Sequence, residues 1–315
     1  MKRLAGVMMC LVMVIGCLSG CGGKTDEALL AGSVKMLNEA KNFDFTSKTT
    51  GKMKVTIGSM SQDVDLTSEV KGTQFMEPFK AKMTANTTTA GTTITTENYL
   101  TKENDKYTAY MKMNNEWSKI TIGDLEQALA TSGMSSLQEQ LSEDVSKYVK
   151  KDDIEESDKK YLVYDYTVSG DEVKNMMKGV TSSMGSILGG GEDGIDMEKI
   201  MNDMVKDIGD ITMTILIDRE NESIYQIRYS MAELMNKIMD SLMKSVAEVV
   251  KETAAKEGKG SESDVDVDAM LASMKFETSS MDMVLSYSNM GSAADFEIPK
   301  EALEAKEMSA DDTAA

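Results

Sequence analysis

Cys21 is the residue whose type and position most clearly permit covalent chemistry. It follows a short positive start, Met1–Arg3, and an apolar run, Leu4–Cys17, that contains no charged side chain. That run is too short to span a bilayer comfortably and has the length of the hydrophobic region of a secretory signal. A thiol just beyond such a run is in position to be modified when the chain is exported.

The four residues that end at Cys21 narrow this prediction. Leu18-Ser19-Gly20-Cys21 has the aliphatic, small, small, cysteine pattern of a lipobox, and so resembles the cleavage site of exported bacterial lipoproteins. The resemblance implies a signal peptide at residues 1–20, a diacylglyceryl thioether on Cys21 and a tether at residues 21–24. Two acyl chains are about what stable anchoring requires. The alternative is an ordinary secretory signal with incidental cysteines.

Other reactive side chains are missing from the sequence. Its three cysteines, Cys10, Cys17 and Cys21, lie within or at the end of the signal, and it has no histidine. Thiol catalysis, Ser-His-Asp hydrolysis and the common zinc sites each need one of these groups. We therefore expect no catalytic residue, no metal site, no cofactor, no disulfide and no enzymatic activity.

The charge balance argues against nucleic acid as a partner. The chain has 53 acidic and 34 basic residues and a formal net charge of −19. Removal of the signal takes away only positive side chains. No dense basic run interrupts this acidic background, as binding to a polyanion would require.

Three further patterns have simple explanations. Gly189–Gly194 lacks the Lys-Ser/Thr of a phosphate-binding loop, which leaves a flexible loop. Asp264–Asp268 begins like a calcium loop, but the turn glycine and the closing glutamate do not follow. Tyr107, Tyr110 and Trp117 could stack on a ligand, although packing at the edge of a sheet is the preferred explanation.

The spacing of apolar residues predicts one α+β domain over residues 25–303. Helical spacing over residues 29–41 gives way to a period of two over residues 43–122, which predicts five or six short antiparallel strands joined by hairpins. Helical spacing returns over residues 124–148, and a strand is expected at residues 162–168.

Helices and strands alternate in the second half. After Gly170 we expect a helix with Asp171 as its N-cap. The remaining expected elements are a helix at 195–208, strands at 211–217 and 224–229, an amphipathic helix at 231–255, a polar linker at 256–268, a strand at 281–287 and a disordered acidic tail at 304–315.

The order of these elements resembles the LolA/LolB and LppX/LprG superfamily of lipoproteins and lipid carriers. The similarity covers about residues 25–303. Its clearest pieces are two paired strand segments, a hairpin and a closing motif, namely Lys106–Tyr110, Glu116–Lys119, Ile217–Ile224 and Phe296–Pro299. It implies a strongly curved antiparallel sheet, a half-open barrel whose concave face is covered by helices, with room for acyl chains between them. The helix and linker at 231–268 depart from that pattern.

Methionine is unusually frequent, with 29 residues. Flexible, unbranched side chains suit a cavity that accepts variable apolar ligands, but methionine can also stand in for leucine in a solid core. If the strands alternate as expected, one set of apolar side chains points to the concave face, opposite methionines of the long helix. This predicted lining consists of Met53, Val55, Met83, Met111, Met113, Met213, Ile215, Met235, Met239, Met281 and Met283.

Two functions are compatible with these features. The first is a membrane-anchored extracytoplasmic lipoprotein that binds or transfers a lipid or another apolar ligand in a methionine-rich cavity. The second is a structural or interaction lipoprotein with a solid core and no ligand. The expected partners are the membrane, reached through lipid on Cys21, and in the first case a lipid or amphiphile.

The anchoring hypothesis predicts that Cys21→Ala abolishes lipid attachment, because Cys21 is the lipid acceptor that the lipobox places after the apolar run. Cells grown with labelled fatty acid should incorporate label into the wild type and none into the variant. Label retained by the variant would contradict the hypothesis.

Overall fold

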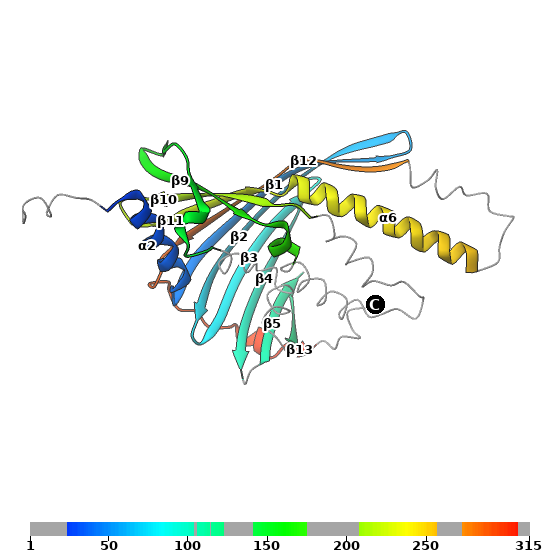
Figure 1. Cartoon of the computed structure of the whole chain (residues 1–315). Coiled ribbons are helices and arrows are strands. Elements are labelled where there is room, and N and C mark those ends of the chain that lie inside the picture. The colour runs from blue at the N-terminus through cyan, green and yellow to red at the C-terminus, as the bar shows by residue number, and fades with distance from the viewer. Residues whose placement is uncertain are drawn as a thin grey trace, which may run out of the picture.

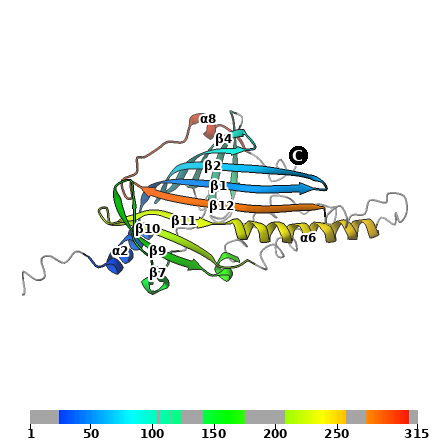
Figure 2. The same cartoon turned by 90° about the horizontal axis from the view of Figure 1, so that it is seen from above.

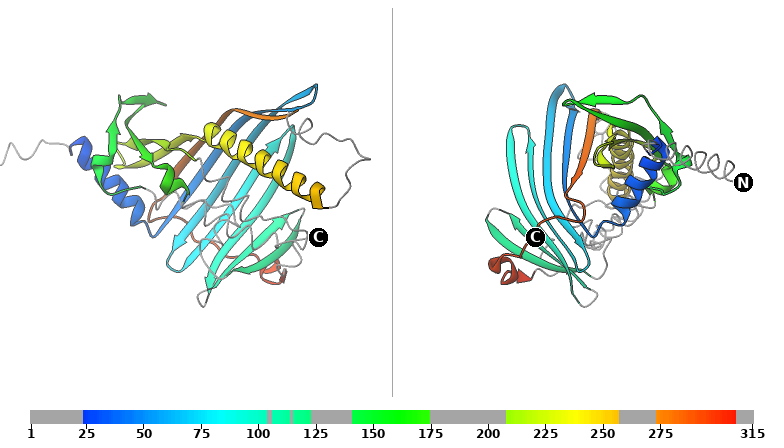
Figure 3. Two further views of the ribbon diagram at one scale, coloured as in Figure 1. Left: turned by 45° about the vertical axis from the view of Figure 1, so that its right-hand side comes forward. Right: turned by 90° about the vertical axis from the view of Figure 1, so that its left-hand side faces the viewer.

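One large sheet dominates the structure. The computed structural model describes residues 24–103, 106–113, 115–122, 141–174, 208–256 and 273–307, and it contains a sheet of 13 strands with helices beside it (Figures 1 and 2). The sheet is curved, and helices α2 and α6 lie on the same side of it in the right-hand view of Figure 3. In this part of the chain no helix is long and apolar enough to cross a membrane.

The first half of the sheet is an antiparallel meander of six strands, as the period of two predicts. Its strands are β1 (Asn42–Ile57), β2 (Met60–Met76), β3 (Phe79–Thr89), β4 (Thr92–Glu103), β5 (Lys106–Met113) and β6 (Glu116–Ile122). The turn residues Gly58, Gly91 and Asn115 have positive φ angles of 60°, 82° and 67°. Such angles suit tight hairpins and are easiest for glycine and asparagine.

The second half continues the same sheet. Its strands are β7 (Tyr148–Lys150), β8 (Ile154–Glu156), β9 (Lys159–Val168), β10 (Ile211–Asp218), β11 (Ser223–Ser230), β12 (Met274–Ser288) and β13 (Lys306–Glu307). The strand order is β13-β6-β5-β4-β3-β2-β1-β12-β11-β10-β9-β7, and β8 pairs with β9. All of these pairings are antiparallel except that of β13 with β6. The pairing of β1 with β12 therefore joins the two halves of the sequence.

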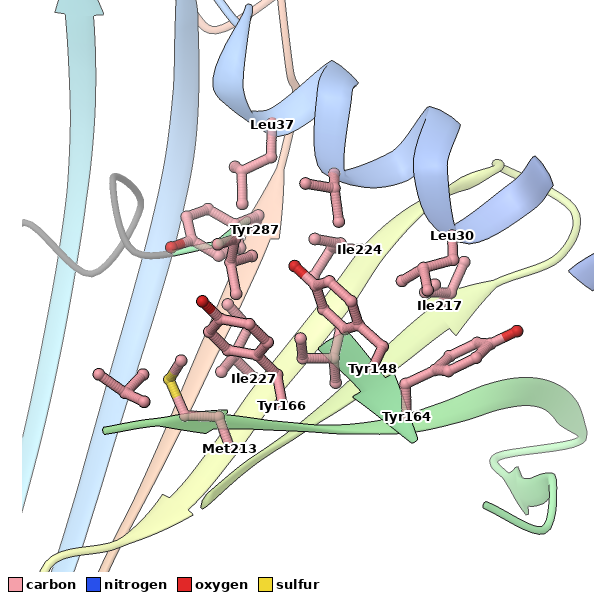
Figure 4. Close-up of a cluster of buried hydrophobic side chains, with 14 of the residues drawn as sticks. Leu30, Leu37, Tyr148, Tyr164, Tyr166, Met213, Ile217, Ile224, Ile227 and Tyr287 are labelled. Atoms are coloured by element: carbon pink, nitrogen blue, oxygen red, sulfur yellow. The ribbon is translucent and has the colours of Figure 1, made fainter. Parts of the chain in front are cut away.

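Helix α2 (Asp26–Asn38) buries one apolar stripe against β10 and β11. Thr25 caps the helix, because its Oγ1 accepts a hydrogen bond from the backbone N–H of Ala28 at 3.2 Å. In Figure 4, Leu30 and Leu37 point from this helix into a cluster of fully buried side chains on the sheet. This cluster is the main core.

Helix α6 (Ala232–Lys256) is held to β12 by Asn236. Strand β12 carries a β-bulge at Ser279, and β11 ends opposite Asp282, so Thr278 has no neighbouring strand on the α6 side. The Asn236 side chain satisfies both backbone groups of Thr278. Its Nδ2 donates to the carbonyl oxygen at 3.0 Å, and its Oδ1 accepts from the N–H at 2.7 Å. One amide thus replaces two ladder hydrogen bonds.

Several boundaries differ from the sequence predictions. The helix expected to reach Tyr148 is wrong at its end: Val145–Lys147 form a short 3-10 helix, and Tyr148 begins β7. The short strand β8 was not predicted. The helix after Val168 is capped by Ser169, not Asp171, because Ser169 and Glu172 exchange side-chain to backbone hydrogen bonds of 2.8 and 3.3 Å in a capping box.

The C-terminal end also departs from expectation. Helix α8 (Lys300–Leu303) is followed by β13 inside the segment expected to be a disordered tail, because Lys306 and Glu307 pair with β6. The expected helices at 124–140 and 195–207, the glycine loop at 189–194 and most of the 256–268 linker lie outside the described residues.

We predict that Asn236→Ala lowers the free energy of unfolding by about 1–3 kcal/mol, because it leaves a buried donor and acceptor of Thr278 unsatisfied. Asp240→Ala, at an exposed position on the same helix, should change it by less than about 0.5 kcal/mol. Urea unfolding of the two variants measures both values. Equal stabilities would show that Asn236 does not hold α6.

Candidate functional site

The strand register gives the sheet two chemically different faces. We call the face that α2 covers the inner face and the opposite one the outer face. Met213 pairs with Tyr229, Tyr229 with Met283, and Met283 with Thr49, and alternation carries this face through β1 and across the meander. The strand residues of the predicted lining, Met53, Val55, Met83, Met111, Met113, Met213, Ile215, Met281 and Met283, all fall on the inner face.

Part of this inner face is a solid core. Met213 is only 1% exposed and Ile215 is fully buried, both within the main core, and Figure 4 shows Met213 near Tyr166 and Ile227. Met83 and Met281 are also buried, outside that cluster. In the main core the predicted lining residues therefore fill the interior themselves.

The other end of the inner face is open. Met53, Val55 and Met111 are half-buried. Four inner-face apolar side chains near strand ends are more exposed still: Ile57 47%, Met60 73%, Ile94 55% and Met113 58%. We call these four residues the open apolar end. Met60 and Ile94 are not among the predicted lining residues, although each continues the alternation of its strand beside a hairpin turn.

The long helix contributes less than the sequence suggested. Leu234 and Ile238 of α6 are buried in the main core, whereas Met235 and Met239 are half-buried. The helix thus packs through its leucine and isoleucine, and its two methionines lie beside that contact.

The aromatic residues considered as a stacking platform are divided between the two faces. Tyr107 lies on the inner face and makes an edge contact with Phe79, with ring centroids 5.6 Å apart. Tyr110 and Trp117 lie on the outer face, where they pack with Phe296 and its neighbours. Packing, the preferred explanation, is what the structure shows.

The start of α2, close to the predicted lipid anchor, is tied to the β10–β11 turn. Arg219 contacts Asp26 and Asp153, each at 3.0 Å, and Lys24 forms an ion pair with Glu222. Burial opposes ionisation of Asp153, but hydrogen bonds from Lys150 and Arg219 outweigh it and lower the pKa of that carboxyl. Cys21 itself lies outside the described residues. Within those residues, no group of three His, Cys, Asp or Glu side chains is arranged to hold a metal ion.

Comparison with known proteins finds one family. Residues 25–256 match the profile described as "Family of unknown function (DUF6612)". No protein with a curated description matches the sequence.

Solved structures are similar only at low scores. LprF from Mycobacterium bovis aligns with a TM-score of 0.39 and 11% identity over 88% of this chain and 96% of its own. The lipoprotein LppX from Mycobacterium tuberculosis aligns at 0.39 and 13% over 87% and 100%. A putative outer membrane lipoprotein-sorting protein domain from Vibrio parahaemolyticus aligns at 0.19 and 7% over 82% and 89%. Proteins of the resembled superfamily thus recur here, but TM-scores below 0.5 establish neither a common fold nor a function.

Because the inner face is divided in this way, a larger side chain should lower the free energy of unfolding much more in the core than at the half-buried position. Met213→Trp should lower the free energy of unfolding by about 1–3 kcal/mol or more, because no space is left in the core for an indole. Met111→Trp, at a half-exposed inner-face position, should cost less than about 1 kcal/mol. Thermal unfolding of the two variants tests this, and an equal loss in both would contradict the division.

Proposed function

This chain belongs to the family of unknown function DUF6612, and we propose that it is a membrane-anchored extracytoplasmic lipoprotein that binds a lipid or another amphiphile at the open apolar end of its inner face. The lipid on Cys21 is the proposed anchor. The exposed side chains at this end are aliphatic and thioether groups, which suit the apolar part of such a ligand.

The exposure of the open apolar end is the observation that carries the proposal. Ile57, Met60, Ile94 and Met113 share one face of one sheet and present apolar surface to solvent. Ile57 pairs with Met60 at the β1–β2 tip, whereas Ile94 is level with Thr49, eight residues back along β1, so the four residues mark out a broad stretch of the inner face. Apolar side chains left exposed in this way are what an apolar ligand would cover. Two of the four are methionines, whose flexible side chains adapt to ligands of different shape.

The two ends of the inner face would then have different tasks. In Figures 1 and 2 the tip of the β1–β2 hairpin lies at the far end of the sheet from α2. The 16 residues of β1 span about 50 Å, whereas the three residue steps from Cys21 to Lys24 reach at most about 11 Å. The α2 end therefore stays near the proposed anchor. Ile57 and Met60 of the open apolar end lie at the tip farthest from it, toward whatever delivers or receives the ligand.

The half-open barrel belongs to the same proposal. A curved sheet with α2 and α6 on its inner side supports an arrangement in which helices cover part of the concave face and leave the remainder to a ligand. The second candidate function, a structural lipoprotein without ligand, is favoured by the solid core under α2. Met213 and Ile215, which a continuous cavity would expose, are fully packed.

A charge placed on the open apolar end should separate the two candidates. We predict that Ile94→Glu reduces the lipid that co-purifies with the protein by about tenfold, since burying a carboxylate against an acyl chain is costly. Thr93→Glu adds the same charge to the outer face of the same strand and should leave bound lipid unchanged. Native mass spectrometry and lipid extraction of protein purified from cells provide the measurement.

Wild-type protein that carries no lipid, together with unchanged stability of Ile94→Glu, would leave the structural lipoprotein as the remaining candidate.

A further inference from the structure

The outer face of β1–β4 contains a polar hollow that the apolar site does not use. It has a volume of about 450 Å³ and is lined by residues of four neighbouring strands, most of them on the outer face, among them Asp44, Thr73, Lys82, Thr84, Glu97 and Tyr99. These residues have the opposite alternation to the methionines, so the hollow lies on the other side of the sheet. Hydroxyl, carboxylate and ammonium groups line it.

Hydrogen bonds fix the two carboxylates of the hollow. Asp44 accepts from Thr73 Oγ1 at 2.6 Å and from Asn289 Nδ2 at 2.7 Å. Glu97 accepts from the Tyr99 hydroxyl at 2.8 Å. Burial, reinforced by that bond, raises the pKa of Tyr99 to about 12, so its hydroxyl stays protonated. The acceptors are thus held in place before any ligand arrives.

Lys82 brings a positive charge to the same hollow. It lies between Thr73 and Tyr99 in the strand register, and its Nζ is 5.1 Å from the centroid of the Phe296 ring. Its neighbour Lys71 is paired with Glu69 at 2.8 Å. Among the residues that the structure describes, no carboxylate forms an ion pair with Lys82.

Aromatic rings adjoin the hollow. The ring centroids of Tyr99 and Trp117 are 5.8 Å apart, and those of Tyr99 and Phe296 are 6.0 Å apart. Lysines gather around them although the whole chain has a net charge of −19: Lys80 lies over Phe296, and Lys112 lies over Trp117. Lys80 also forms an ion pair with Asp295, whereas Lys82 and Lys112 are held over aromatic rings without an ion pair to any carboxylate of the described residues.

From these features we propose that the hollow binds an acidic glycan, a chain of sugar units that carry carboxylates. Sugar hydroxyls pair with preoriented hydroxyl and carboxylate groups, Lys82 meets the sugar carboxylate through a charge-assisted hydrogen bond, and the adjoining rings offer apolar surface to the sugar faces. An acyl chain would leave these polar groups unpaired. A protein exposed outside the membrane would meet such glycans in the cell envelope.

The test is a titration of the full-length lipidated protein in a detergent without sugar groups. The probes are a trisaccharide of galacturonic acid, a neutral trisaccharide of galactose and inorganic phosphate. Trp117, the single tryptophan of the chain, adjoins the hollow and reports binding by fluorescence. The acidic trisaccharide should bind at least about tenfold more tightly than either other probe.

Two variants and a control locate the binding. Lys82→Gln should weaken binding of the acidic trisaccharide by about tenfold or more. Glu97→Gln keeps an acceptor for Tyr99 but removes a like charge, so it should strengthen binding roughly two- to fivefold. A misfolded variant would not gain affinity. Lys54→Gln, an exposed outer-face position outside the hollow, should have no effect.

Three outcomes would overturn the proposal. They are no binding of the acidic trisaccharide by the wild type, the same affinity in the Lys82 and Lys54 variants, and phosphate binding as tight as that of the trisaccharide, which would show that the hydroxyl groups contribute nothing. None of them bears on lipid binding at the inner face.

Discussion

The pairing of β1 with β12 is the contact on which the rest of the structure depends. These strands lie more than 200 residues apart in the sequence and pair from Asp44 with Ser288 to Ile57 with Met274. This ladder fixes which side chains of the first meander share a face with those of β9–β11. A slip by one residue would turn every methionine of one half to the opposite side. Asn236 secures the same strand where a bulge interrupts the ladder.

Once the register is set, each face follows its own chemistry. The inner face collects leucine, isoleucine, methionine and tyrosine under α2, where burial of apolar area is the main stabilising term. The outer face collects threonine and lysine, with Phe296 folded back over Tyr99 and Lys82. A sheet with one dry and one wet face is common, but in the part of the chain that the structure describes both faces extend beyond their helical or C-terminal covering. The two proposed sites occupy these uncovered regions.

The distribution of burial along the inner face connects stability with the proposed function. Residues under α2 are packed too tightly to yield space, so they hold the sheet in its curved shape. The open apolar end contributes little to that packing and can change its contacts at small cost. A module that takes up an amphiphile needs both parts, because a rigid frame must persist while the lining rearranges.

Local sequence patterns determined much of this protein. Alternation gave the six-strand meander, helical spacing gave α2 and α6, and the lipobox residues gave the anchoring prediction, because each signal lies within a few neighbouring residues. The true cap of the helix after Val168 also has a local signal, since Ser169 and Glu172 stand three residues apart in the capping-box spacing, although Asp171 fits the general preference for an N-cap as well.

Only the tertiary structure decided which inner-face residues are core and which are open. Met213 and Met113 follow the same alternation in sequence, yet one is packed in the main core and the other lies at a strand end. The polar hollow was invisible for the same reason, since Asp44, Lys82 and Glu97 come from separate strands. Long-range strand pairing brings such residues together, and periodicity within one segment carries no information about the partner strand.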